Sequence, residues 1–248
     1  MKRAMIQQVP VPDYTAVESL NTLATNITFT ENNTKAIVLT SCRKHDGKSS
    51  LSFLVAKTLC EMGYDTVLID ADLRGSVLKS NFGVRLEDPG LGLSHYLSRE
   101  DVEMDDIIYQ TNINNFFLIP SGHDVANSMQ LLSSKRLELL IQALKAEFDY
   151  IIIDTPPVGA IVDAATVGRC CDGALLVVTY NQTTRGEVRV AQEQIQAGGC
   201  PLLGMVLNKV VLNRASSKYY YHSYYYSSYG NYYYKRSDEE RKKRKEND

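Results

Sequence analysis

The sequence of 248 residues predicts a doubly wound α/β fold, in which helices flank a mostly parallel sheet, followed by a tail of different composition. Short apolar runs that are nearly continuous, as expected for strands buried on both faces, alternate with segments of helical spacing. Beyond residue 212 these runs cease and tyrosines dominate. A doubly wound sheet binds ligands at the carboxyl ends of its strands, so the residues at those ends are the candidates for function.

Six short runs rich in Val, Ile and Leu are the predicted strands. They cover residues 36–40, 66–70, 116–119, 150–154, 174–179 and 203–208. Residues 17–27 can form a helix, and residues 49–62 predict a second one that ends near Gly63. A third helix follows Ser134, a residue type favoured at N-caps, because five apolar residues then share one face. They are Leu137, Leu140, Ile141, Leu144 and Phe148.

Changes in character along the chain predict three parts. Residues 1–34 form an N-terminal segment with one helix, residues 35–212 form the α/β core, and residues 213–248 form a flexible tail. Between Lys218 and Lys235 the tail has no aliphatic residue that could anchor a core. Such a composition is typical of a disordered segment.

The overall composition is that of an ordinary globular protein, with 44% hydrophobic and 23% charged residues. A formal net charge of -2 argues against a general nucleic-acid binder. Five cysteines without a CxxC pair predict reduced thiols in a cytosolic compartment. No apolar run approaches the roughly 20 residues of a membrane-spanning helix. No secretion signal is evident either, so we expect a cytoplasmic protein whose association with a membrane comes through a partner.

A glycine-containing loop follows the first predicted core strand and opens the predicted helix at 49–62. It reads Thr-Ser-Cys-Arg-Lys-His-Asp-Gly-Lys-Ser-Ser over residues 40–50. Backbone N–H groups at such a helix N-terminus, together with the helix dipole, bind phosphate. In a P-loop of this kind Lys48 reaches the β and γ phosphates and the Ser49 hydroxyl ligates Mg²⁺. Cys42 stands where the full pattern has glycine, which leaves open a turn that contains Gly-Lys-Ser by chance.

Three aspartates stand at the ends of two further predicted strands. Asp70 and Asp72 project from the same side of the chain, since they are two residues apart, and Asp154 ends another strand. Any one of them could serve only as a helix cap. Together with the loop they match the needs of phosphoryl transfer: a phosphate cradle, oxygens that hold Mg²⁺, and an acceptor for the proton of the attacking hydroxyl. The sequence therefore predicts a P-loop NTPase-like core.

The tail holds ten of the sixteen tyrosines of the chain. They are Tyr219, Tyr220, Tyr221, Tyr224, Tyr225, Tyr226, Tyr229, Tyr232, Tyr233 and Tyr234. Such a cluster could be a nucleic-acid stacking surface or an aggregation-prone tract. The interspersed serines and the lack of aliphatic residues favour an accessible chain instead. When extended, residues 213–238 would span on the order of 80 Å, so the tyrosines could reach the site of the same subunit or of a neighbour.

These motifs resemble those of the bacterial tyrosine kinases, in particular the stand-alone cytoplasmic subunit that regulates capsular and exopolysaccharide synthesis. That family carries a P-loop, an Asp-x-Asp-x-Arg motif, a strand that ends in Asp and a tyrosine-rich C-terminus. In this chain the four lie, in the same order, at residues 47–49, 70–74, 154 and 219–234. Further matching segments are residues 119–122, 131–134 and 204–208, so the resemblance covers roughly residues 15–234.

The resemblance implies an ATP-dependent protein-tyrosine kinase that phosphorylates its own C-terminal tyrosines. The implied nucleotide-binding residues are Asp46, Gly47, Lys48, Ser49, Ser50 and Asn208. Asn208 and Lys209 follow the last predicted core strand, where the family's adenine contacts lie. Ser49, Asp72 and Asp154 would hold Mg²⁺, the two aspartates through bound waters. Asp70 is the candidate acceptor of the tyrosine proton, and it completes a catalytic set with Lys48, Asp72 and Asp154.

The resemblance also implies partners. The activator would be the cytoplasmic segment of a transmembrane modulator of the polysaccharide co-polymerase type, and a phosphotyrosine phosphatase would reverse the reaction. The substrate would be the tail of the same or a neighbouring subunit, and no nucleic acid is expected. Homo-oligomerisation stays open, because the family's ring-forming Glu-x-x-Arg-x-x-Arg motif aligns with Glu18, Asn21 and Ala24, which lack both arginines.

The loop itself departs from the family at residues 44–46, where Lys-His-Asp replaces the usual Pro-Gly-Glu. His45 stands where glycine would relax the backbone, so either the turn tolerates a side chain or the loop is strained. Arg43 and Lys44 either add positive charge near the phosphates or are solvated loop charges.

Two alternative functions share the predicted core. The main one is a P-loop ATPase switch of the type that positions septa or partitions plasmids. Those proteins place a lysine where this chain has Arg43, and Arg and Lys are not interchangeable at a phosphate. They also lack a tyrosine-rich tail. The other alternative is a binding scaffold whose altered loop has lost catalysis.

Overall fold

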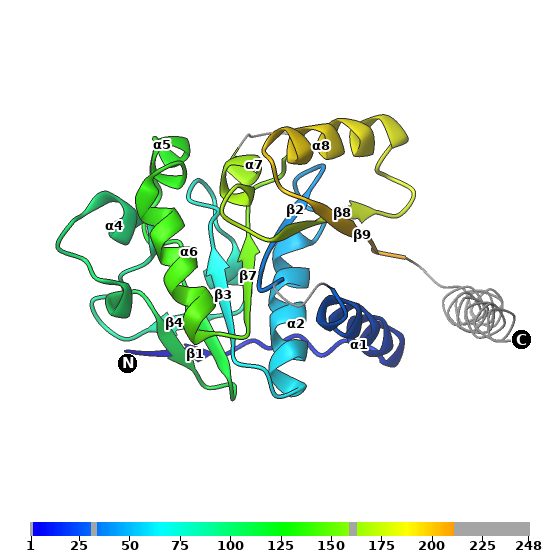
Figure 1. Cartoon of the computed structure of the whole chain (residues 1–248). Coiled ribbons are helices and arrows are strands. Elements are labelled where there is room, and N and C mark those ends of the chain that lie inside the picture. Colours follow the sequence, from blue (N-terminus) through cyan, green and yellow to red (C-terminus); the bar gives the residue numbers. More distant parts are fainter. Residues whose placement is uncertain (1, 31–33, 159–162, 211–248) are drawn as a thin grey trace, which may run out of the picture. The chain divides into compact units, whose positions relative to one another are not determined.

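The structure, a computed structural model, describes residues 2–30, 34–158 and 163–210 of the chain (Figure 1). All but the last of these residues belong to the first of two units, Met1–Lys209, and the second unit is Val210–Asp248. The ten tail tyrosines therefore lie outside the described residues. The boundaries expected after residues 34 and 212 stay predictions.

Nine strands of the described part form one sheet, in the order β4-β1-β5-β6-β3-β7-β2-β8-β9. Their bounds are β1 Lys2–Ile6, β2 Ala36–Ser41, β3 Thr66–Asp70, β4 Val84–Leu86, β5 Tyr109–Thr111, β6 Phe116–Ile119, β7 Tyr150–Asp154, β8 Gly173–Thr179 and β9 Leu202–Asn208. The strands from β6 to β9 in this order run parallel, whereas β4 is antiparallel to β1 and β5 to β6. A mostly parallel sheet confirms the predicted fold class.

All six predicted strands are confirmed, with ends that differ by at most one residue. Sequence reasoning missed β1, β4 and β5, which have only three to five residues each. In β1 only Ala4 and Ile6 are buried, so its apolar signal is interrupted by exposed or half-buried residues. Short strands at one side of a sheet lack the continuous apolar run that marks the central strands.

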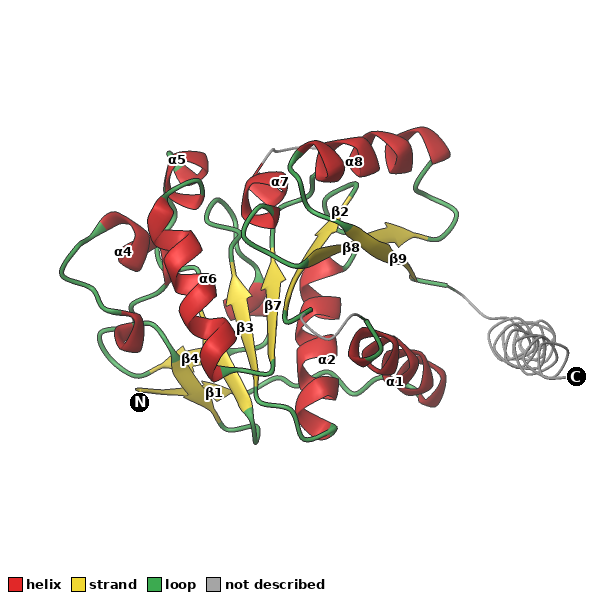
Figure 2. Cartoon of the chain, in the orientation of Figure 1, coloured by secondary structure: helices red, strands yellow, loops and turns green. Residues whose placement is uncertain are grey.

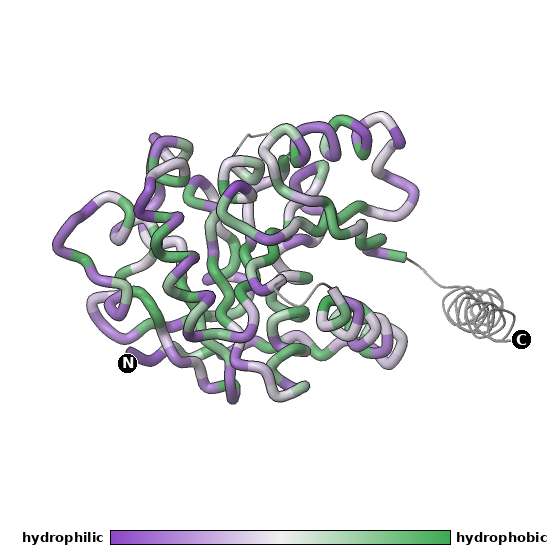
Figure 3. Tube along the Cα trace, in the orientation of Figure 1, coloured by the Kyte–Doolittle hydropathy of each residue, from purple (hydrophilic) through white to green (hydrophobic). Residues whose placement is uncertain are grey.

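Helices cover both faces of the sheet (Figure 2). Their bounds are α1 Tyr14–Thr28, α2 Lys48–Glu61, α3 Leu78–Asn81, α4 Leu93–Ser98, α5 Ser128–Leu132, α6 Lys135–Glu147, α7 Asp163–Gly168 and α8 Arg185–Ala197, with a 3-10 turn at Met104–Asp106. Buried residues of α1, α2 and α3 join one apolar core, and those of α4 to α8 join the other. Val38 of β2 belongs to one core and its neighbours Ile37 and Leu39 to the other, so this strand is buried on both faces. Figure 3 shows hydrophobic residues gathered along the central strands.

Helix α2 is fixed to the sheet by burial. It was predicted over residues 49–62 and spans Lys48–Glu61, and Gly63 beyond it has a left-handed φ of 96°. The ring of Phe53 stacks on Phe82 at a centroid distance of 4.0 Å and meets Phe116 edge-on at 5.3 Å. Because the loop before α2 joins this buried helix directly, the core sets the position of the loop.

The other two predicted helices form with different ends and caps. α1 begins at Tyr14, three residues before the prediction, because the Asp13 carboxylate accepts a capping hydrogen bond from the Ala16 N–H at 2.8 Å. Ser134 occupies the N-cap position of α6, but its buried hydroxyl makes no hydrogen bond with the described residues. The five apolar residues predicted for this helix are all buried, so α6 depends on apolar burial and not on capping.

No helix among the described residues combines the length and the hydrophobicity needed to cross a bilayer. The five cysteines carry free thiols. Burial raises the pKa of Cys42 and of Cys200 to about 11, and that of Cys60 to about 12. These three thiols stay protonated at neutral pH and are therefore weak nucleophiles.

Candidate active site

The predicted loop and carboxylates meet at the carboxyl ends of β2, β3 and β7, which are neighbours in the sheet (Figure 1). Lys48 opens α2, and its Nζ lies 3.6 Å from Asp154 Oδ1 and 3.7 Å from Asp72 Oδ2. The same amine donates to the Ser49 hydroxyl at 3.1 Å. One ammonium group thus contacts a hydroxyl and two carboxylates contributed by three separate segments of the sequence.

Asp154 is the most enclosed of the three carboxylates. It ends β7 with 1% of its surface exposed, and the Ser52 hydroxyl of α2 donates to its Oδ1 at 3.2 Å. Burial raises the pKa of Asp154, and the nearby Lys48 ammonium opposes that rise. Ser52 was not singled out from the sequence, although its place one turn after Lys48 on the same helix face was a signal that could have identified it.

Asp70 is the buried carboxylate at the end of β3. Its Oδ1 accepts the Asp72 N–H at 3.3 Å, and its Oδ2 accepts the Ser76 hydroxyl. Burial, with a smaller contribution from the charge of Asp154, raises the pKa of Asp70 to about 7, against the opposing hydrogen bond from Ser76. A carboxyl group with this pKa exchanges protons readily near neutral pH.

The loop in front of α2 contains two left-handed residues, His45 with φ 66° and Gly47 with φ 87°. The sequence left open whether residue 45 tolerates a side chain or is strained. The structure places His45 in a left-handed conformation that favours glycine, so the loop accepts the side chain at a cost in backbone strain. At Gly47 a Cβ atom would lie 2.4 Å from Asn208 Nδ2, which donates to the Asp46 carbonyl at 2.8 Å. The left-handed φ therefore favours glycine at residue 47, and a Cβ atom there would also displace the Asn208 side chain.

Asp46 has its carboxylate turned into the protein. Its Oδ1 accepts the Thr179 hydroxyl of β8 at 2.7 Å, and its Oδ2 accepts the Arg43 N–H at 2.8 Å. Only 4% of Asp46 is exposed. The carboxylate therefore shapes the loop, so nucleotide binding by Asp46 would fall to its backbone. Ser50, in contrast, is exposed in the first turn of α2.

Arg43 is bound to another side chain of the same chain. Its guanidinium forms a two-pronged ion pair with Glu187 of α8, with Nη2 2.7 Å from Oε2. Glu187 also closes a capping box with Thr184, and the hydrogen bonds from Arg43 lower its pKa to about 2. Lys44 makes no hydrogen bond or ion pair with the described residues. Arg43 is therefore not a solvated loop charge, whereas for Lys44 both alternatives stay predictions.

The oxygen set of the site suits Mg²⁺. Mg²⁺ in phosphoryl-transfer sites keeps several waters and takes one or two carboxylates together with substrate phosphates. Ser49, Asp72 and Asp154 gather around one ammonium group and offer one hydroxyl and two carboxylates. Within the described ranges, no cluster of three or more His, Cys, Asp or Glu side chains could hold a metal ion.

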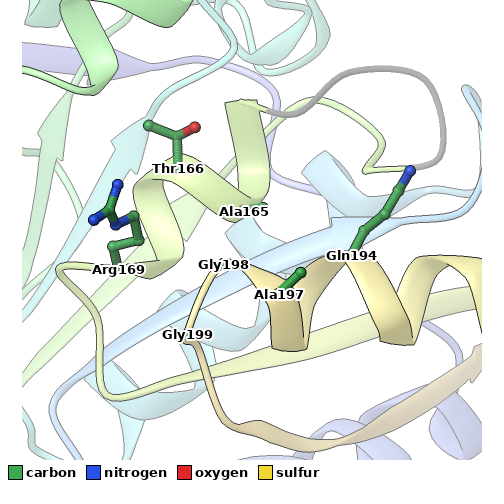
Figure 4. A pocket seen from close by; sticks show the side chains of 7 residues that line it. All are labelled: Ala165, Thr166, Arg169, Gln194, Ala197, Gly198 and Gly199. Carbon is green, nitrogen blue, oxygen red and sulfur yellow. The ribbon is translucent and has the colours of Figure 1, made fainter.

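A hollow of about 630 Å³ lies elsewhere, between α7 and α8 (Figure 4). It is lined by Ala165, Thr166, Arg169, Gln194, Ala197, Gly198 and Gly199. None of these residues belongs to the predicted site.

Of the three ring-motif positions on α1, Glu18 and Asn21 are exposed, whereas Ala24 is fully buried against the core.

A family model for the AAA domain matches residues 34–182, more than half of the chain. The chain is 40% identical over 193 residues to the tyrosine-protein kinase CpsD of Streptococcus agalactiae serotype III (strain NEM316), with 78% of this chain and 82% of that protein covered. The kinase domain of the Escherichia coli tyrosine kinase ETK has a TM-score of 0.73 and 26% identity, with 84% of each chain covered. The septum site-determining protein MinD of Pyrococcus horikoshii OT3, complexed with Mg-ADP, has a TM-score of 0.61 and 26% identity, with 73% of this chain and 72% of that chain covered.

Proposed function

The chain belongs to the family of bacterial tyrosine-protein kinases, and from this premise we propose that its P-loop site transfers the γ-phosphoryl group of ATP to tyrosine side chains. The observation that carries the proposal is the convergence of Lys48 Nζ on Asp72 and Asp154 at 3.7 and 3.6 Å, beside Ser49. In this arrangement Lys48 binds the β and γ phosphates, and the backbone of residues 46–50 cradles them at the start of α2. Asn208, already bonded to the loop, stays the candidate for the adenine side of the nucleotide.

Ser49, Asp72 and Asp154 are the residues that would hold Mg²⁺. When bound, Mg²⁺ neutralises charge on the phosphate oxygens during transfer. Lys48 reaches both Asp72 and Asp154 and offsets part of their negative charge. A set of hard oxygen ligands beside a phosphate-binding lysine supports ATP-dependent transfer over a site for a soft transition metal.

The reaction balances with one proton acceptor. A bond forms between tyrosine Oη and the γ-phosphorus, the bond from that phosphorus to the β,γ-bridging oxygen breaks, and ADP leaves. The phenolic proton goes to a carboxylate. Asp70 is the candidate because it stands at the end of β3, next to Asp154 in register, and is bonded to Ser76 and not to Lys48.

The acceptors in this proposal are the ten tyrosines between Tyr219 and Tyr234, which lie outside the described residues. Their clustering in one segment, after the last strand of the core, supports the proposal. Each phosphate adds about -1.5 to -2 charges at neutral pH. A multiply phosphorylated tail becomes strongly anionic, which favours its release from any surface that holds the neutral form.

Regulation of capsular or exopolysaccharide synthesis follows from the same family assignment. The expected activator is the cytoplasmic segment of a transmembrane modulator, through which the kinase would reach the membrane, and the expected antagonist is a phosphotyrosine phosphatase. The substrate tail belongs to the same subunit or to a neighbour in a homo-oligomer. The buried Ala24 leaves no surface position for the second arginine of the ring motif, so any ring would need other contacts.

The ATPase-switch alternative is less favoured. The chain is structurally more similar to the ETK kinase domain, with a TM-score of 0.73, than to MinD, with 0.61. The residue that aligns with the lysine of the switch proteins, Arg43, is paired with Glu187 of its own α8. It is therefore held within the subunit by an ion pair.

One assay separates the three candidate functions. The purified chain is incubated with Mg·ATP, with and without a peptide of the modulator's cytoplasmic segment, and ADP and phosphotyrosine are measured in the same samples. A kinase gives phosphotyrosine together with ADP. ADP without phosphotyrosine would favour the ATPase switch, and failure to bind ATP at millimolar concentration would favour the scaffold.

A further inference from the structure

A hydrogen bond joins two left-handed residues, neither of them glycine, at the phosphate-binding loop. His45 has φ 66° and Lys209, just after β9, has φ 58°. Lys209 Nζ donates to the His45 carbonyl oxygen at 2.5 Å. Beside it Asn208 Nδ2 donates to the Asp46 carbonyl at 2.8 Å. Two successive carbonyl groups of the loop are thus bonded to two successive side chains at the end of β9.

The His45 turn carries a cost that a glycine would not bear, because a Cβ atom crowds the backbone in the left-handed conformation. Such a residue persists only where its surroundings hold it in place. The side chain of Asp46 holds the loop from the side of β8 through Thr179. The carbonyl of His45 is held from the side of β9 by Lys209.

The contact lies just before the start of α2, where Lys48 begins. A shift of the His45 peptide would move the N–H groups of the next residues, and these are the groups that a P-loop directs at phosphate. Lys209 and His45 are both exposed, so neither residue is part of the apolar core. Loss of the contact should therefore affect the loop and leave the fold intact.

We propose that Lys209 is a positioning residue of the phosphate-binding loop, and that its ammonium group holds the left-handed turn at His45. The consequence for ATP rests on the proposed function, whereas the consequence for the loop does not. The matched change is His45→Gly, which keeps the carbonyl acceptor and removes the cost of the turn. If Lys209 acts through His45, its removal matters in the histidine background and matters little in the glycine background.

The first test measures hydrogen–deuterium exchange of residues 43–48 without nucleotide, in the full chain. Lys209→Ala should speed exchange of this loop by roughly threefold to tenfold, the range of one lost hydrogen bond. The same change in a His45→Gly chain should have an effect below about twofold. Lys44→Ala removes a positive charge from the same loop and serves as the control with unchanged exchange. Residues 66–70 of β3 report on global stability and should not change in any variant.

The second test measures tyrosine phosphorylation as a function of ATP. Lys209→Ala should raise KM for ATP by a similar roughly threefold to tenfold factor, with little change in kcat, and Lys209→Arg should restore the KM. Equal effects of Lys209→Ala in the wild-type chain and in the His45→Gly chain would overturn the proposal, because they would indicate direct action of Lys209 on the nucleotide. Unchanged loop exchange, or faster exchange in β3 as well, would also overturn it. If the wild type uses no ATP, the proposed function fails while the exchange measurement still decides on Lys209.

Discussion

Asp70 and Asp154 stand opposite each other as the last residues of β3 and β7, paired in register at the carboxyl edge of the sheet. The Ala71 N–H, one residue after β3, donates to the Asp154 carbonyl at 2.8 Å, which fixes the backbone at the end of the two strands. The two carboxylates have different partners: Asp154 lies beside Lys48, and Asp70 is bonded to Ser76. Different partners for adjacent carboxylates allow one to support a cation and the other to exchange a proton.

Asp154→Asn should lower the rate of tyrosine phosphorylation by roughly 10–100-fold, the usual effect of removing a group that supports a metal site through bound water. Its hydrogen bond from Ser52 can persist on the amide oxygen, so the fold should remain. Asp149→Asn, at the opposite end of β7, is the control and should keep the wild-type rate. Equal rates for Asp154→Asn and the wild type in an initial-rate assay would contradict the assigned role.

Gly47→Ala should weaken ATP binding by about tenfold or more, since a left-handed alanine alone costs about 1–2 kcal/mol and its Cβ would lie 2.4 Å from Asn208 Nδ2. Titration with a fluorescent ATP analogue measures the loss. Wild-type affinity of Gly47→Ala would show that the loop does not hold the phosphates.

The free energy of unfolding of the nucleotide-free protein should depend on Asp70. Its pKa is about 7 in the folded chain, whereas an unfolded aspartate titrates near about 3.9. The folded state then binds more protons between these values, so stability falls as pH rises from about 4 to 7. At about 1.4 kcal/mol for each tenfold change in the ionisation constant, the loss is on the order of a few kcal/mol. Asp70→Asn should reduce this decrease in urea unfolding with EDTA at several pH values, and the contribution of Asp154, whose pKa burial also raises, should remain. Parallel curves for the two proteins would argue against a raised pKa of Asp70.

Phe53→Ala should destabilise the protein by about 3–5 kcal/mol, the range for truncating a fully buried aromatic residue. The ring is 1% exposed and contacts both Phe82 and Phe116. Leu139→Ala, at a half-exposed position of α6, should change stability by less than about 0.5 kcal/mol. Urea unfolding at one pH measures both variants, and similar losses for the two would show that α2 is not anchored through Phe53.

The central strands were predictable because burial on both faces leaves a continuous apolar run, as in residues 150–154. The strands β1, β4 and β5 were not predictable, because a sequence of three to five residues with exposed positions looks the same as that of a loop. Helix α8 was missed because only Ala191 and Ile195 of its residues are buried. Its capping box, Thr184 with Glu187, was a visible signal.

The site was predictable in outline for a topological reason. Parallel strands end at one edge of the sheet, so Lys48, Asp70 and Asp154 had to gather there once the strands were placed. The contacts that refine the site come from side chains far apart in the sequence, such as Thr179 with Asp46 and Arg43 with Glu187. No local pattern encodes such pairs, because they depend on how β8 and α8 pack around the loop.

The central claim is that one site, centred on Lys48, phosphorylates the tail. The direct measurement is mass-spectrometric mapping of phosphate after incubation with Mg·ATP and the modulator peptide. It compares the wild type, Lys48→Met, and a variant with all ten tail tyrosines changed to Phe. We expect phosphate on several residues between Tyr219 and Tyr234 in the wild type, and none there in either variant. A wild-type tail without phosphate, or equal labelling of Lys48→Met, would contradict the claim.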